Sequence, residues 1–221
     1  MFENGVTAIN FSRRQDLINA RASRTTHPKT LALLEKFFSL VDDDTIKIAT
    51  PFFWMTKTDV LKSIRSHDRQ DMIPSSVSCS KTFKHIGVSP QCGACYQCID
   101  RRFAAFGAEL EEVDHKGLYA MDFVGSSISD GEAKTAVIDY VRQAKSFSEW
   151  NVDHFHDQLL SELSEVDDYI DGKSESERVT KVWELCKRHG EQVFCAARRM
   201  RDLYDNLRVS PESESLIALI S

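Results

Sequence analysis

The stretch SCSKTFKHIGVSPQCGACYQC, residues 78–98, contains four of the six cysteines of the chain. Cys92, Cys95 and Cys98 follow one another with two residues between them, and Cys79 lies thirteen positions before the first of the three. Zinc takes four thiolates in a tetrahedron, and short Cys-x-x-Cys steps with one distant cysteine can close such a site. With all four positions taken by protein, the metal is structural and not catalytic. The sequence therefore predicts a closed, structural zinc site at these four thiols.

An iron–sulfur cluster is the alternative metal centre, because Cys-x-x-Cys-x-x-Cys also begins a ferredoxin-like pattern. That pattern continues with a fourth cysteine and a proline, whereas Cys98 is followed by Ile-Asp-Arg-Arg. Gly93 permits the tight turn that aims successive sulfurs at one ion. The preceding loop, residues 81–91, offers few apolar groups, so metal binding and not burial would order it.

The composition limits the class of protein. The chain has 221 residues, of which 42% are hydrophobic, and its net charge is −6. This charge argues against a protein that coats nucleic acid. No run approaches the roughly 18–20 apolar residues of a membrane span, and the N-terminal MFENGVTAINFSRR lacks the pattern of a secretory signal. We therefore expect a cytoplasmic protein, in which a cysteine cluster indicates a metal site and not disulfides.

The first part of the chain, residues 1–125, combines strand-like and helical patterns. VTAINF (6–11) and TIKIAT (45–50) have the apolar, β-rich composition of strands. Helices are predicted over 28–41, from a capping box at 56–59 to about 64, and over 98–110. Strands with intervening helices predict an α/β fold, although two strands are too few for a complete sheet.

The second part, residues 126–221, has the periodicity of helices alone. Apolar residues recur at helical spacing in three segments, 133–147, 155–170 and 182–207. Each helix would have an apolar stripe able to pack on another. We therefore predict an α-helical extension that folds as a semi-independent bundle, with a domain boundary near residue 125.

Three segments in this order resemble the 7-cyano-7-deazaguanine synthases, the QueC-like family: TPFFWMTKTDVLKSI (50–64), SCS (78–80) and CGACYQCIDRRFAAF (92–106). In that family a T-P-x-x-x-x-T/S-K-x-E/D-[IV] segment precedes an S-C and then C-G-x-C-x-x-C-x-x-R. The resemblance covers about residues 1–108, and the cysteine pattern with its flanks is specific to it.

Two upstream segments are more similar to a divergent branch of these proteins, found in bacterial anti-phage defence operons. They are ENGVTAIN (3–10) and ARASRTTHPKTL (20–31). Housekeeping enzymes of the family have an Arg-Asn segment where this chain has Arg24-Thr25-Thr26-His27. The length of the helical part after residue 125 also matches the defence branch.

The resemblance implies the C-terminal part of an adenine-nucleotide-alpha-hydrolase-like (PP-loop) domain in an ATP-dependent ligase. In such enzymes a carboxylate is adenylated, ammonia attacks, and the amide becomes a nitrile with a second ATP. The pyrophosphate-binding loop, S-G-G-x-D-S, uses glycines to bring backbone N–H groups to the phosphates. The chain contains no such sequence; VGSSISDG (124–131) lacks the paired glycines and the Asp-Ser order. We therefore expect Met1 to be an internal start and the isolated chain not to turn over ATP.

Four polar residues in matched segments are the expected substrate- or nucleotide-binding residues: Arg24, His27, Lys57 and Arg101. The resemblance places Arg24 and Lys57 near the nucleotide, and Arg101 where the family has an arginine after the last cysteine. Arginine and lysine can bind phosphates or a carboxylate. Structural alternatives remain: a loop arginine for Arg24, a capping or buried His27, an exposed lysine at the start of a helix for Lys57, and a solvated helix residue for Arg101. No catalytic residue is assigned.

Two functional hypotheses follow. In the first, the chain is the zinc-bearing part of an ATP-dependent ligase in anti-phage defence, with ATP bound only when a missing N-terminal PP-loop half is present. Its partners would be that half or other defence-operon subunits, and its substrate a small molecule or a protein. In the second, the chain is a non-catalytic, zinc-stabilised module that docks a partner subunit. Neither hypothesis involves a membrane or nucleic acid as a direct ligand.

Overall fold

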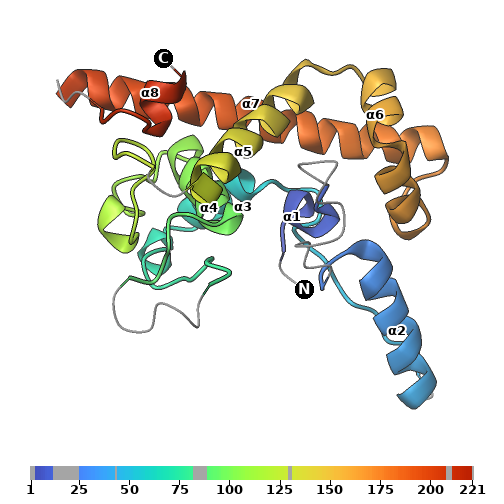
Figure 1. The fold of residues 1–221 in the computed structure, drawn as a ribbon. Helices are drawn as coiled ribbons and strands as arrows, with labels where there is room; N and C mark the ends of the chain where they lie inside the picture. The colour runs from blue at the N-terminus through green and yellow to red at the C-terminus, as the bar shows by residue number, and fades with distance from the viewer. Residues whose placement is uncertain are drawn as a thin grey trace. The chain divides into compact units, whose positions relative to one another are not determined.

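The computed structural model describes residues 3–11, 25–42, 44–81, 89–128, 131–207 and 211–220 (Figure 1). The regular elements are α1 (Gly5–Ile9), α2 (Pro28–Asp42), α3 (Lys57–Ser66), η2 (Gln70–Met72), α4 (Tyr96–Gly107), η4 (Lys116–Leu118), α5 (Gly131–Glu149), α6 (Val152–Val166), η5 (Asp167–Tyr169), α7 (Glu175–Leu207) and α8 (Leu216–Ile220). Among the helices described, none is long and apolar enough to cross a bilayer.

The predicted α/β fold is wrong. Across the described ranges the regular structure is helical, and the β-type pairing in them is an isolated parallel bridge between Gln91 and Tyr119. A partial PP-loop domain needs a sheet, which this part of the chain does not form. The helices predicted for the first part of the chain are confirmed, as are those of residues 126–221.

The segment VTAINF, predicted as a strand, lies largely in the short helix α1. The Asn4 side chain caps this helix by accepting a hydrogen bond from the Thr7 amide at 3.2 Å. Asn10 ends it in the left-handed conformation, with φ of 54°, and its amide bonds to the Val6 carbonyl. Asparagine is favoured at both kinds of cap, so the two caps outweigh the β-rich composition between them.

The segment TIKIAT, also predicted as a strand, is an irregular stretch bound to α2. The Ile46 amide donates to Ser39 Oγ at 2.9 Å, and the Ile48 amide donates to Glu35 Oε1 at 2.7 Å. Side chains of the preceding helix thus accept the hydrogen bonds that these backbone N–H groups would donate to a neighbouring strand in a sheet.

The chain forms two compact units, each built from two stretches of sequence. The first comprises Met1–Thr56 and Ser146–Gly190. Its core is aromatic and aliphatic: Phe11 lies edge-on to Phe147 and Phe155, with ring centroids 6.2 and 5.8 Å away. The Trp183 indole N–H donates to the Trp150 carbonyl at 2.9 Å. The ring contacts join α5 and α6 to the N-terminal residues, and the indole bond joins α7 to Trp150, which lies between α5 and α6.

The second unit comprises Lys57–Lys145 and Glu191–Ser221, and α4 lies at its centre. Residues of α4 from Cys98 to Phe106 are all buried. Phe103 packs against Tyr140 of α5 at a centroid distance of 5.0 Å and against Phe123 at 6.1 Å. Burial on several sides fixes α4, which contributes part of the cysteine cluster. Independent folding of residues 126–221 stays a prediction.

Candidate metal centre

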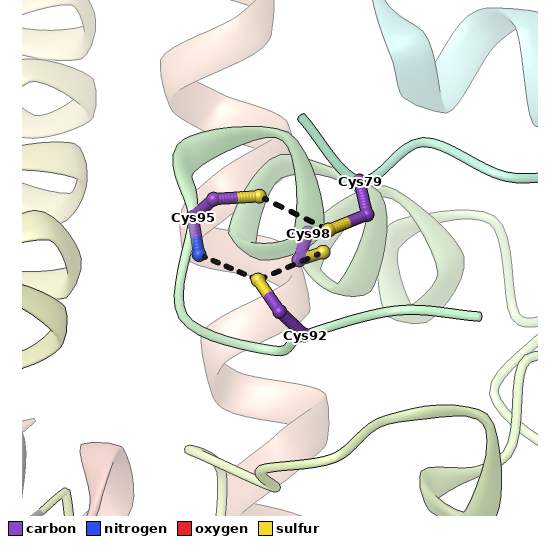
Figure 2. Close-up of side chains that lie close together, drawn as sticks. All are labelled: Cys79, Cys92, Cys95 and Cys98. Carbon is purple, nitrogen blue, oxygen red and sulfur yellow. Dashed lines mark hydrogen bonds between the residues drawn. The ribbon is translucent and has the colours of Figure 1, made fainter. Parts of the chain in front are cut away.

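The four predicted thiols come together in one buried cluster, shown in Figure 2. The sulfur atoms of Cys79, Cys92, Cys95 and Cys98 all lie within 4.8 Å of one another. Cys92 Sγ lies 3.8 Å from Cys98 Sγ, and Cys95 Sγ lies 4.0 Å from Cys79 Sγ. A tetrahedral zinc site with Zn–S bonds of about 2.3 Å has sulfurs about 3.8 Å apart. The spacing therefore fits a four-coordinate metal ion held by thiolates alone.

A turn and the first residues of α4 position three of the ligands. Cys95 is the N-cap of α4, and Cys98 lies in the first turn, where its amide donates to the Cys95 carbonyl at 3.0 Å. Cys92 precedes the turn. Cys79 comes from the segment after η2, so the metal would join two segments distant in the sequence.

Backbone amides surround the sulfurs with hydrogen-bond donors. The amides of Ala94 and Cys95 both donate to Cys92 Sγ at 3.3 Å, and the Lys81 amide donates to Cys79 Sγ at the same distance. Amide donors favour the charged thiolate over the thiol. The N-terminus of α4 adds a favourable dipole at Cys95 and Cys98. These donors stabilise anionic sulfur, the form that binds metal, whereas the hydrogen bond with Cys95 and burial keep the pKa of Cys92 raised.

The close sulfurs shift the pKa values of Cys95 and Cys98 in opposite directions. Hydrogen bonds with the Cys92 and Cys95 sulfurs, together with burial, raise the pKa of the Cys98 thiol far above its ordinary value. The pKa of Cys95 is lowered, chiefly by its hydrogen bond with Cys92. In such a cluster a negative charge on one sulfur disfavours deprotonation of the next, because the two charges repel. A bound divalent cation instead favours the deprotonated form of its thiol ligands.

Gln91 supports the centre and was missed by the sequence analysis. Its fully buried side chain lies with Oε1 3.6 Å from Cys98 Sγ. The same oxygen accepts from the Ser78 amide at 3.3 Å, and Nε2 donates to the Ser76 carbonyl at 3.0 Å. Gln91 therefore fixes the chain just before Cys79 to the helix that bears Cys98. A glutamine next to a ligand has no distinctive sequence pattern.

Arg101 is buried in a network on the same helix. Its Nε donates to Asp114 Oδ1 at 2.7 Å, and its other nitrogens donate to the Ser76 carbonyl at 2.7 Å and the Ile73 carbonyl at 2.8 Å. Asp114 is itself fully buried and also accepts from the Tyr119 hydroxyl at 2.5 Å. Burial and the Asp114 charge raise the pKa of Tyr119. The guanidinium of Arg101 is engaged within the protein, and its predicted contact with substrate or nucleotide stays a prediction.

Lys57, the first residue of α3, pairs with α4. Its Nζ lies 2.8 Å from Asp100 Oδ2 and 3.2 Å from Gln97 Oε1. Asp100 Oδ1 accepts a hydrogen bond from the Tyr140 hydroxyl at 2.8 Å. The Lys57 side chain is only 16% exposed, so it is not the exposed lysine of the structural alternative. A nucleotide-binding role for Lys57 stays a prediction.

The other two predicted binding residues belong to the first compact unit. His27 is buried and precedes α2, with its carbonyl accepting from the Leu31 amide at 3.0 Å. It thus occupies the buried, helix-starting position that was its structural alternative, and its binding role stays a prediction. Arg24 lies outside the described residues.

Replacing Gly93 by alanine is expected to weaken the metal centre. Gly93 has φ of 77°, and an added Cβ would lie 1.9 Å from the Met121 carbonyl oxygen. The left-handed conformation alone costs a non-glycine residue about 1–2 kcal/mol. Relief of the clash would move the turn beside Cys92, so we expect metal affinity to fall on the order of tenfold or more. Competition with a chromophoric chelator measures this.

The matched control for that change is Gly131→Ala. Gly131 begins α5, and a Cβ there meets nothing within 4 Å. Metal affinity in this variant should equal that of the unmodified chain. Equal affinity in Gly93→Ala would show that the turn does not set the geometry of the ligands.

Comparison with known families identifies the segment around the centre. Residues 25–109 match the family model described as queuosine biosynthesis protein QueC. The matched range contains the four thiols, Lys57 and Arg101. No curated protein and no solved structure matches the chain. Residues 25–109 are therefore similar to the QueC family, and this segment contains the four-cysteine cluster whose geometry suits a metal ion.

Proposed function

We propose that the chain is the zinc-bearing part of a QueC-like, ATP-dependent ligase whose pyrophosphate-binding loop is supplied outside this sequence. The observation that supports this most directly is the family match over the segment that holds the four buried thiols. Four thiolates at tetrahedral spacing suit zinc, and they leave no position for a substrate. In this proposal zinc therefore orders the segment around Cys79–Cys98 and does no chemistry.

The binding residues of the proposal are those that the resemblance implies. Lys57 is held between Asp100 and Gln97, and its side chain is 16% exposed, so in this proposal an anionic group approaches from the side that neither partner occupies. Contact with a phosphate or a carboxylate would use that side. Arg24, His27 and Arg101 complete the proposed set, with Arg101 acting through its support of α4.

The biological setting of the proposal is anti-phage defence, and it rests on the resemblance of residues 3–10 and 20–31 to the defence branch. The partner would be the polypeptide or segment bearing the glycine-rich loop, or another subunit of the same operon. The acceptor would be a small molecule or a protein in the cytoplasm.

The chain alone should release no pyrophosphate from ATP, because no glycine-rich loop cradles the phosphates. Co-purified with a loop-bearing protein from the same operon, it should release pyrophosphate when the acceptor carboxylate is added. In that complex Lys57→Ala should lower the rate on the order of 100-fold, as loss of a charged contact to a developing anion does. Lys62→Ala, at an exposed position of α3, is the control and should leave the rate unchanged. ATP turnover by the isolated chain at constant specific activity would contradict the proposal.

The second candidate function is a non-catalytic zinc-stabilised module that docks a partner subunit. The engagement of Arg101 by Asp114, Ser76 and Ile73 favours it, because that side chain is then structural. A stable complex with an operon subunit that shows no ATP-dependent activity, and is indifferent to Lys57→Ala, would favour this candidate over the ligase.

A further inference from the structure

Helix α2 is apolar on two opposite faces, and one of them is already covered. Leu31 is buried, and residues 45–50 lie along the same side through the bonds to Ser39 and Glu35. Elements α6 and η5 of the same compact unit also contact α2. A helix that needed only this packing would be polar on its outer side.

The outer side of α2 is instead an apolar stripe. It consists of Leu33, Phe37, Leu40 and Val41, whose exposed fractions are 56, 58, 72 and 70%. Their spacing of i, i+4, i+7 and i+8 places them on one face. Phe38, 42% exposed, adjoins the stripe, with its ring centroid 5.6 Å from that of Phe37.

This stripe is comparable in size to the largest apolar patch of a typical monomer, a patch that is often functional. The five side chains expose a patch on the order of 500 Å², the size of patches that commonly serve as binding sites. Two such patches brought together would bury about 1,000 Å² in all, at the lower end of specific interfaces. Such an interface supports a weak dimer whose population depends on concentration.

The charges of α2 are arranged so that a second copy fits. Exposed Lys29 lies near the N-terminal end, and exposed Asp42 and Asp44 lie at the C-terminal end. Two copies packed antiparallel about Phe37 bring Lys29 of one close to Asp44 of the other, twice by symmetry. The helix dipoles then also run in opposite directions.

We propose that the outer stripe of α2 binds a second copy of this chain through an antiparallel helix pair. The inference stands independently of the proposed function, since neither the metal nor ATP takes part in it. The two-fold symmetry makes the surface self-complementary, with apolar residues at the centre and opposite charges at both ends.

Sedimentation velocity of the zinc-loaded full chain over a range of concentrations tests the proposal. We expect a monomer–dimer equilibrium, and Phe37→Glu should raise the dissociation constant at least about tenfold, because it places two like charges at the centre of the interface. Leu160→Glu is the control: Leu160 is 54% exposed on α6, and this change should leave the dissociation constant unchanged. Far-ultraviolet circular dichroism verifies that both variants fold.

A charge exchange tests the antiparallel arrangement itself. Lys29→Asp and Asp44→Lys should each weaken the dimer several-fold, because each places like charges together at both ends. The double variant should regain the original dissociation constant within about twofold, since every pair is opposite again. The proposal is overturned by a chain that stays monomeric at all concentrations, by a dimer that survives Phe37→Glu, or by a double variant no tighter than the single ones.

Discussion

Replacing Cys95 by serine is expected to release the metal and to remove most of the stability of the unit that contains α4. Cys95 contributes one sulfur of the cluster and is also the N-cap of α4. Structural zinc supplies about 10–16 kcal/mol to the folding of small peptides, whereas a whole domain is stable by about 5–15 kcal/mol. Elemental analysis should find about one zinc per unmodified chain, as one four-thiolate site requires, and none in the variant. Thermal unfolding of the variant should lose cooperativity.

The control for this change is Cys195→Ser. Cys195 is an exposed thiol of α7 and is not part of the metal cluster. Its replacement should leave both the zinc content and the melting temperature unchanged. Iron with labile sulfide in a brown protein would show that the centre is an iron–sulfur cluster. Zinc retained by Cys95→Ser would show that three thiols and a hydroxyl suffice.

The metal cluster could be predicted because its chemistry depends on local spacing. Two-residue intervals between cysteines set the distances among three ligands, and Gly93 provides the turn between two of them. The contribution of Cys79 was inferable only because few other cysteines exist. The support from Gln91 was not inferable, since it depends on backbone groups of Ser76 and Ser78 that come close only in the fold.

The fold class could not be predicted from the same patterns. VTAINF and TIKIAT are each six residues long, and short apolar segments of this kind are compatible with either a strand or a helix. Asn4 and Asn10 decided the first case by capping both ends of α1. In the second segment, side chains of α2 accept hydrogen bonds from the amides of Ile46 and Ile48, so these amides do not pair with a strand. Longer periodic segments, such as that of α7, were predicted correctly because many residues share one period.

Replacing Asp114 by asparagine is expected to lower the stability of the protein by about 3–5 kcal/mol, the usual cost of removing one partner from a buried ion pair. Asp114 is fully buried and faces Arg101 Nε at 2.7 Å and Arg102 Nη1 at 3.8 Å. The two arginine side chains are only 5 and 7% exposed. Without the carboxylate, two guanidinium groups stay in the interior with no negative charge between them. The melting temperature should fall on the order of 10 °C.

Glu109→Gln is the matched control for that loss. Glu109 pairs with Arg65 at 3.3 Å, but the two side chains are 58 and 50% exposed. Exposed ion pairs contribute about 0–1 kcal/mol, since water screens them and both side chains lose freedom. The control therefore also removes a carboxylate charge that faces an arginine, but at an exposed position. Its melting temperature should stay within about 3 °C of that of the unmodified chain.

The zinc content of Asp114→Asn separates the arginine network from the metal centre. Asp114 is not among the ligands. It is linked to the cluster through Arg101, the Ser76 carbonyl and Gln91, and through Tyr119, which packs against the cysteines. The folded variant should therefore keep about one zinc per chain while it unfolds at a lower temperature. Loss of zinc from folded Asp114→Asn would mean that the network and the metal centre form one cooperative unit. A melting temperature equal to that of Glu109→Gln would mean that Arg101 and Arg102 find other partners, and that burial of this pair does not depend on Asp114.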